Sequence, residues 1–156
     1  MNDIRVQLTN EQIMAAAYAG VERQAKNIIK GNKSAHRSDS PCQDWQIHVE
    51  GCLTELALSL YLGLPWKGKG VLGEPDVGDE HESRNTRYHT GKLSLYKKDH
   101  IERRFWLLVG ANGRYEVRGW IWGRDGKQDK YWGSLPGKTY KTWYVPQSDL
   151  HPPGER

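Results

Sequence analysis

The segment from Asp44 to Leu62 constrains the fold more than any other, because it predicts a helix that is apolar on most of its circumference. Such a helix must be covered by other elements on nearly every side. Gly63 and then Pro65 predict its end. Glu55 places a carboxylate in the middle of this helix. Because a buried charge without a partner is unfavourable, we expect a cationic group to face Glu55.

Another helix is predicted before it, from Thr9 to about Lys30. Thr9 and Gln12 have the spacing of a capping box, in which each side chain accepts a hydrogen bond from the other residue's backbone N–H. Apolar residues then recur at helical spacing, at Ile13, Ala17, Val21, Ala25 and Ile28. The polar, turn-rich residues 31–42 predict a loop between the two helices.

From residue 66 onward the pattern changes to short strands. The candidates are residues 76–77, 81–85, 92–97, 105–109, 115–122 and 142–145. Asn112 and Gly113 predict a tight turn, so residues 105–110 and 114–122 are expected to form a β-hairpin. The last residues, 151–156, are expected to form a frayed tail. Two N-terminal helices followed by a mostly antiparallel central sheet define an α+β fold class.

The composition limits the class of protein. The 156 residues predict a single domain, with a helix and a loop in residues 1–43 and the core in residues 44–150. No apolar run reaches the roughly 18 residues of a membrane span. The first residues lack the pattern of a secretory signal, so a cytoplasmic location is expected. Cys42 and Cys52 form no zinc-binding spacing with the histidines and are expected to be reduced thiols.

An acidic cluster follows the helices. Five of the nine residues from 74 to 82 are acidic, and Arg84 and Arg87 come directly afterwards. In a strand, residues two apart point to the same face, which places Glu82 beside Arg84. A tight turn at Gly78 would bring Asp76 next to Glu82. Two carboxylates, water and phosphate are the ligands with which proteins bind Mg²⁺, so this cluster predicts a metal site facing a phosphate.

These residues resemble the PD-(D/E)XK nuclease superfamily. Pro75-Asp76 and Glu82-Ser83-Arg84 match its short signature, with Arg84 in the position of the lysine. A wider pattern is similar to small phage-encoded proteins grouped with this superfamily, and it covers residues 44–152. It consists of Gly51…Glu55-Leu-Ala, Pro-Asp-Val-Gly, Glu-x-Arg, Gly91-Lys-Leu, the FWLLVG strand, Gly119-Trp-Ile and Tyr144-Val-Pro.

The resemblance implies a restriction-endonuclease-like core in residues 44–150 and a nuclease that depends on Mg²⁺ or Mn²⁺. Asp76 and Glu82 would bind the metal, with the backbone carbonyl of Ser83. Glu55 would be an accessory ligand, and Arg84 would hold the scissile phosphate. Arginine stays protonated, so it offers no tunable base where the family has lysine. The gap of five residues between Asp76 and Glu82 is also shorter than is usual in the family.

A basic stretch adjoins the acidic cluster. Residues 84–104 contain seven Lys or Arg against two acidic residues. Basic surface of this kind binds the phosphate backbone, so the partner is expected to be nucleic acid, with DNA preferred over RNA. Besides Arg84, the candidate contacts are Arg87, Lys92, Lys97, Lys98, Arg103 and Arg104. Four aromatic residues among or near these charges are candidates for stacking on bases, namely Tyr88, Tyr96, Trp120 and Trp122.

Two alternatives to a nuclease remain open. The chain could be a catalytically inactive nucleic-acid- or protein-binding member of the same fold, in which Arg84 pairs with Glu55 and leaves no place for a metal. It could instead be a phage protein that disables a host factor through a Trp-rich face. If it cuts both strands of a duplex, a homodimer is the expected assembly.

Overall fold

The computed structural model describes residues 4–32, 41–68 and 73–155, so parts of two predicted loops, at residues 33–40 and 69–72, lie outside the described residues. No helix in the described ranges is long and apolar enough to cross a membrane. The elements in chain order are β1 (Arg5–Gln7), α1 (Asn10–Ile29), α2 (Pro41–Leu62), β2 (His81–Thr86), β3 (Leu93–Leu95), β4 (Arg104–Ala111), β5 (Arg114–Trp122), α3 (Gly123–Gly126), β6 (Trp132–Gly133) and β7 (Thr142–Val145). Single turns of 3-10 helix lie at Asp129–Tyr131 and Gln147–Asp149.

The strands form two sheets. The larger sheet has the order β1-β5-β4-β2, and the smaller one has the order β3-β7-β6. β2 runs parallel to β4, whereas the other strand pairs are antiparallel. The predicted α+β class and the β4–β5 hairpin are therefore confirmed. The predicted element order was incomplete, because β1 precedes both helices and pairs with β5 at the edge of the sheet.

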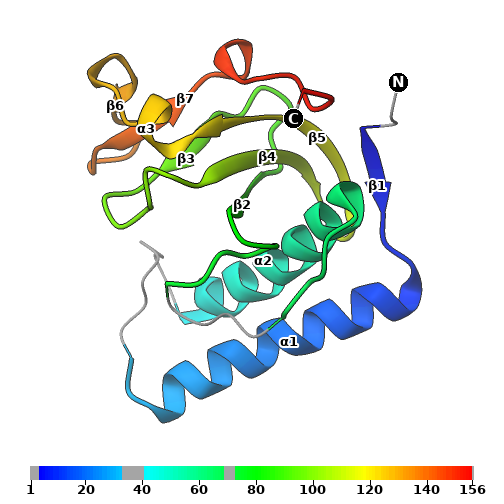
Figure 1. The fold of residues 1–156 in the computed structure, drawn as a ribbon. Helices are drawn as coiled ribbons and strands as arrows, with labels where there is room; N and C mark the ends of the chain where they lie inside the picture. The colour runs from blue at the N-terminus through cyan, green and yellow to red at the C-terminus, as the bar shows by residue number, and fades with distance from the viewer. Residues whose placement is uncertain (1–3, 33–40, 69–72, 156) are drawn as a thin grey trace.

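Two hydrophobic cores hold the layers together. Figure 1 shows α2 between the larger sheet and α1, with the smaller sheet on the opposite side. Successive residues of β4 point to opposite faces. Trp106 and Leu108 therefore pack with Cys52 and Leu56 in the core beneath α2. Phe105 and Leu107 face the other way, into the core that includes Leu93 and Val145 of the smaller sheet.

Both helices have the ends that the sequence predicts, within a few residues. The Thr9 side chain accepts from the Gln12 N–H at 3.2 Å, and the Gln12 side chain accepts from the Thr9 N–H at 2.8 Å, so the capping box is confirmed. α2 begins at Pro41, three residues before the predicted start. It ends at Leu62, before Gly63 with a φ of 67°.

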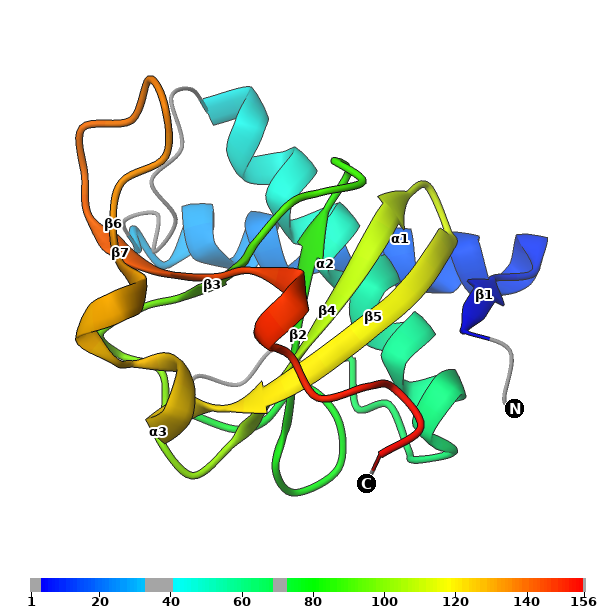
Figure 2. The ribbon, with the colours of Figure 1, turned by 90° about the horizontal axis from the view of Figure 1, so that it is seen from above.

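The buried face of α1 consists of Ala16, Gly20 and Gln24. Val21 and Ile28, which recur at helical spacing in the sequence, are instead 43% and 56% exposed. The reason is the close approach of α2, which crosses α1 in Figure 2. A Cβ atom built on Gly20 would lie 2.5 Å from the Cα atom of Val49. Only a small residue permits this approach, so the crossing is placed at Gly20 and not at the larger apolar residues.

We expect Gly20→Ala to destabilise the protein by about 1–3 kcal/mol, because the added methyl group collides with the backbone of α2 and forces the helices apart. Gly51→Ala is the matched control, since a Cβ on Gly51 meets no atom within 4 Å. Gly51 is inside α2, so alanine should there stabilise the protein by about 0.5–1 kcal/mol. Urea denaturation of both variants measures the two effects. Equal stabilisation by both changes would contradict the close helix crossing.

The C-terminal residues are ordered against the sheet, so the prediction of a frayed tail was wrong. The His151 backbone N–H donates to the Trp120 carbonyl at 2.8 Å, and the His151 carbonyl accepts from the Trp120 N–H at 3.1 Å. The Trp120 indole N–H donates to the Glu155 carbonyl at 2.7 Å. The His151 ring also stacks on the Trp120 ring, with centroids 4.4 Å apart. These contacts were not predicted, because Pro152 and Pro153 near the end of the sequence suggest an irregular tail.

Candidate active site

A tight hairpin places Asp76 beside β2. Val77 and His81 exchange two backbone hydrogen bonds, at 3.0 and 3.2 Å. The turn between them passes through Gly78, whose φ of 57° is in the left-handed region that favours glycine. Because Val77 pairs with His81, the preceding residue Asp76 and the following residue Glu82 lie on adjoining segments. The short gap between the two acidic residues is therefore compatible with their meeting.

The carboxyl groups of Asp76 and Glu82 are close enough to share a hydrogen bond. One Asp76 oxygen, Oδ2, also accepts from the backbone N–H of Ser83 at 2.9 Å and from its hydroxyl at 3.3 Å. Burial, and secondarily the negative charge of Glu82, raise the pKa of Asp76 to about 7, although the Ser83 N–H acts in the opposite direction. The two carboxyl groups thus lie next to each other at the edge of the sheet, and Asp76 stays protonated up to near neutral pH.

An arginine occupies the other side of Glu82. The Arg103 Nη1 atom lies 2.5 Å from Glu82 Oε1, and both side chains are largely buried. Arg103 also donates to the backbone carbonyl of Gly73. In contrast, no Lys, Arg or His of the described residues forms an ion pair with Asp76. The positive charge of Arg84 acts on Asp76 only from beyond ion-pair distance, whereas Arg103 contacts Glu82 directly.

Glu55 is buried in α2 and does face a cation, as the sequence predicts. The partner is Arg23 of α1, whose two terminal nitrogens donate to the two Glu55 oxygens at 2.8 Å each. The Trp66 indole N–H donates to Oε2 at 3.3 Å. Burial raises the pKa of Glu55, the bond from Arg23 lowers it, and the nearby charge of Asp76 raises it further. Both Glu55 oxygens are therefore occupied by hydrogen bonds.

Arg23 was not identified from the sequence, although a signal for it exists. It belongs to the stripe of α1 that contains Ala16, Gly20 and Gln24, and these three residues are buried. A charged residue on a buried helix stripe needs a buried partner. Once the face of α1 is known, Arg23 is the expected counterpart of Glu55.

Arg84 does not pair with Glu55, so the ion pair considered for the inactive alternative is wrong. β2 places Arg84 on the face opposite the helices, where its guanidinium lies 5.0 Å from the centre of the Phe105 ring. There it pairs with Asp99 at 2.7 Å and donates to the carbonyls of Ser94 and Ser83, at 3.1 and 3.0 Å. Burial acts to lower the pKa of Arg84, but Asp99 raises it above the ordinary value. Arg84 is thus part of a buried network.

The predicted nucleic-acid contacts fall into two groups. Arg87, Lys92, Lys97 and Lys98 are exposed. Arg103 and Arg104 are largely buried instead, and Arg104 pairs with Glu80 at 3.3 Å. Of the candidate stacking residues, Tyr88 is 65% exposed. Trp120 is only 4% exposed and belongs to the core, so the prediction that it stacks on bases was wrong.

The donor set for a divalent metal is smaller than predicted. In the described part of the chain, no group of three or more His, Cys, Asp or Glu side chains is arranged to hold a metal ion. Two side chains remain suitable, because Asp76 and Glu82 present adjoining carboxyl groups whose mutual repulsion a cation would relieve. Mg²⁺ is usually bound through one or two carboxylates, with water completing its coordination. Asp76 and Glu82 therefore fit such an ion, whereas Glu55 does not.

Comparisons with models of known protein families, with curated proteins and with solved structures give no match. The function must therefore be inferred from the geometry of the site and the chemistry of its residues.

Proposed function

We propose that the protein is a metal-dependent nuclease that hydrolyses phosphodiester bonds in nucleic acid, with Asp76 and Glu82 as its metal ligands. The observation that carries this proposal is the pair of adjoining carboxyl groups at the edge of β2, with the raised pKa of Asp76. Carboxyl pairs with strongly perturbed pKa values occur preferentially at functional sites. The order of Pro75-Asp76 and Glu82-x-Arg84 supports membership of the PD-(D/E)XK superfamily in addition.

A bound Mg²⁺ or Mn²⁺ would supply a hydroxide near neutral pH and neutralise charge on the phosphate. The chain's own residues prepare the site for this ion. The Ser83 N–H and hydroxyl fix the orientation of the Asp76 carboxylate, and Arg103 fixes Glu82. The Ser83 carbonyl accepts from Arg84 and would be the third oxygen ligand of the proposed ion.

The role of Arg84 in this proposal differs from the role that the resemblance implies. Its guanidinium is held by Asp99, Ser94 and Ser83, so it positions the backbone of β2 and does not contact a phosphate. Arg103 is the guanidinium next to the metal ligands, because it contacts Glu82 directly. We therefore assign the stabilisation of phosphate charge to Arg103.

A second candidate function is a non-catalytic nucleic-acid-binding protein of the same fold. The observation that favours it is the pairing of Glu55 with Arg23 and of Glu82 with Arg103. Each arginine neutralises a carboxylate that a metal would otherwise share. In this case the Asp76–Glu82 pair would be a structural hydrogen bond.

A cleavage assay distinguishes the two candidates. Single- and double-stranded DNA and RNA are incubated with the protein in 5 mM MgCl₂ or MnCl₂, and with EDTA. We expect cleavage of at least one substrate with metal, none with EDTA, and a loss of at least 100-fold in Asp76→Asn, which removes the metal-binding charge. Asp79→Asn, in the exposed part of the same turn, is the matched control and should retain activity. Nucleic acid binding without cleavage in any metal would support the second candidate.

A further inference from the structure

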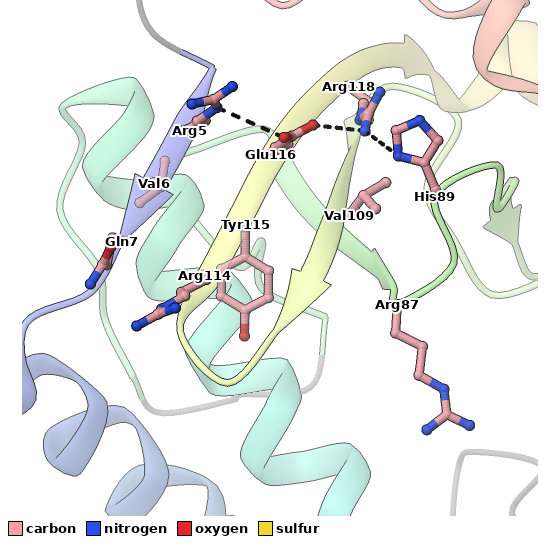
Figure 3. A pocket seen from close by; sticks show the side chains of 10 residues that line it. All are labelled: Arg5, Val6, Gln7, Arg87, His89, Val109, Arg114, Tyr115, Glu116 and Arg118. Carbon is pink, nitrogen blue, oxygen red and sulfur yellow. Dashed lines mark hydrogen bonds and ion pairs between the residues drawn. The ribbon is translucent and has the colours of Figure 1, made fainter.

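A hollow of about 390 Å³ lies over β1, β5 and the loop that follows β2, and none of the acidic residues of the 74–82 cluster lines it. Its charged lining consists of Arg5, Arg87, Arg114, Arg118 and Glu116, with His89 beside them. Figure 3 shows these side chains coming from three separate segments of the chain. Four guanidinium groups and one carboxylate thus line the hollow, which gives it a net positive charge.

The single carboxylate is shared between two of the arginines. Glu116 lies 2.7 Å from Arg118 and 3.9 Å from Arg5. The same Arg118 nitrogen is 3.0 Å from His89 Nδ1, and the buried Arg118 Nε atom has no hydrogen-bond partner among the described residues. The single carboxylate balances only one of the two positive charges on this side of the hollow.

The other two arginines are free of acidic partners. Neither Arg87 nor Arg114 forms an ion pair with any described residue, and both are exposed. Arg87 lies against the Tyr88 ring, with its guanidinium 5.4 Å from the ring centre. In Figure 3 Arg87 and Arg114 extend in different directions, at some distance from the Arg5–Glu116–Arg118 group. The four guanidinium groups are therefore spread along the hollow and do not converge on one point.

We propose that this hollow binds the phosphate backbone of a nucleic acid chain, at several successive phosphates. Arginine is suited to this ligand, because its planar fork can donate two hydrogen bonds to one phosphate. A single small anion would need converging donors, whereas dispersed guanidinium groups match the repeated charges of a chain. A duplex carries a phosphate every 3.4 Å along each strand.

The position of the hollow relative to the carboxyl pair fits one continuous ligand. Arg87 follows the C-terminal end of β2, and Glu82 lies near its N-terminal end. Five residues of extended strand span about 16 Å, which is about five base-pair steps. A nucleic acid held at the carboxyl pair could therefore also reach the hollow. This part of the inference rests on the proposed function, whereas binding in the hollow does not.

The test is fluorescence anisotropy with a fluorescein-labelled 20-bp DNA duplex, in EDTA, over a series of KCl concentrations. We expect Arg87→Ala/Arg114→Ala to weaken binding at least tenfold. The slope of log K against log salt should fall by about 1.8, because each lost phosphate contact removes about 0.9. Lys30→Ala/Lys138→Ala is the matched control, since it removes two exposed positive charges outside the hollow. Its loss of affinity should be below threefold.

Glu116→Gln is expected to raise the affinity for the duplex, a result that misfolding of the variant would not produce. It removes the one carboxylate of the hollow and should strengthen duplex binding several-fold. Equal losses in the two double variants, no gain in Glu116→Gln, or no duplex binding by the wild type would each overturn the proposal. Because EDTA excludes metal, failure of the nuclease proposal leaves this result unchanged, and the two proposals can fail separately.

Discussion

Arg23→Met is expected to destabilise the protein by about 3–5 kcal/mol, because it leaves the Glu55 carboxylate buried without a cation. The Glu55 side chain is only 8% exposed, and both of its oxygens accept from Arg23. After the change, the Trp66 indole N–H would be its remaining hydrogen-bond donor. In a chain of this size the melting temperature should fall by about 10 °C or more, measured by circular dichroism.

Two further variants isolate the charge effect. Arg23→Met/Glu55→Gln should recover most of the loss, because no unpaired charge then remains in the core. Lys26→Met is the matched control on the same helix. It breaks the Lys26–Glu22 pair, which is 2.9 Å long but exposed, and exposed pairs contribute about 1 kcal/mol or less. If Arg23→Met were no more destabilising than Lys26→Met, the Arg23–Glu55 pair would not hold the helices together as described.

Asp76→Asn should stabilise the protein at pH 8 without added metal, while abolishing the nuclease activity that we propose. The pKa of Asp76 is raised to about 7 from an ordinary value of 3.8, so the folded protein holds this proton more tightly than the unfolded chain does. The resulting stabilisation is complete below pH 3.8 and is lost as the pH rises through 7. Asparagine stays neutral and can still accept from the Ser83 N–H. Relative to the wild type, its melting temperature should rise by about 5 °C at pH 8 and by little at pH 4.

Asp79→Asn is the control for this pH dependence. Asp79 is exposed in the same turn, so its replacement should change the melting temperature little. A gain for Asp76→Asn that did not grow between pH 4 and pH 8 would contradict the raised pKa. Stabilisation by removing a functional charge is a common trade-off, because active sites hold groups in unfavourable surroundings.

Local sequence signals predicted much of the fold. Three signals each determine the structure of only the few residues around them. They are the capping box at Thr9, the glycine after α2 and the Asn112-Gly113 turn. The hairpin at Gly78 was likewise predicted, and it brings Asp76 to Glu82. β1 was not predicted, because three residues carry no periodic pattern. The division into two sheets was also missed, because strand partners depend on contacts between distant segments.

The partners of the site residues depend on the same long-range contacts. The sequence indicated that Glu55 needs a cation, because burial of α2 is a local inference. That the cation is Arg23 depends on how α1 crosses α2, which Gly20 determines. The inactive alternative paired Arg84 with Glu55, but the alternation of β2 turns Arg84 to the opposite face, where Asp99 binds it. Residue types in a motif thus predicted the carboxyl pair but not its surrounding arginines.

The central claim is that Asp76 and Glu82 bind a divalent metal, and calorimetric titration with MnCl₂ at pH 8 tests it most directly. At this pH Asp76 is ionised, so the wild type should bind about one ion, and Asp76→Asn should lose at least tenfold in affinity. Asp79→Asn should bind as the wild type does. No heat of binding in the wild type, or equal binding by Asp76→Asn, would contradict the claim and leave the carboxyl pair a structural feature.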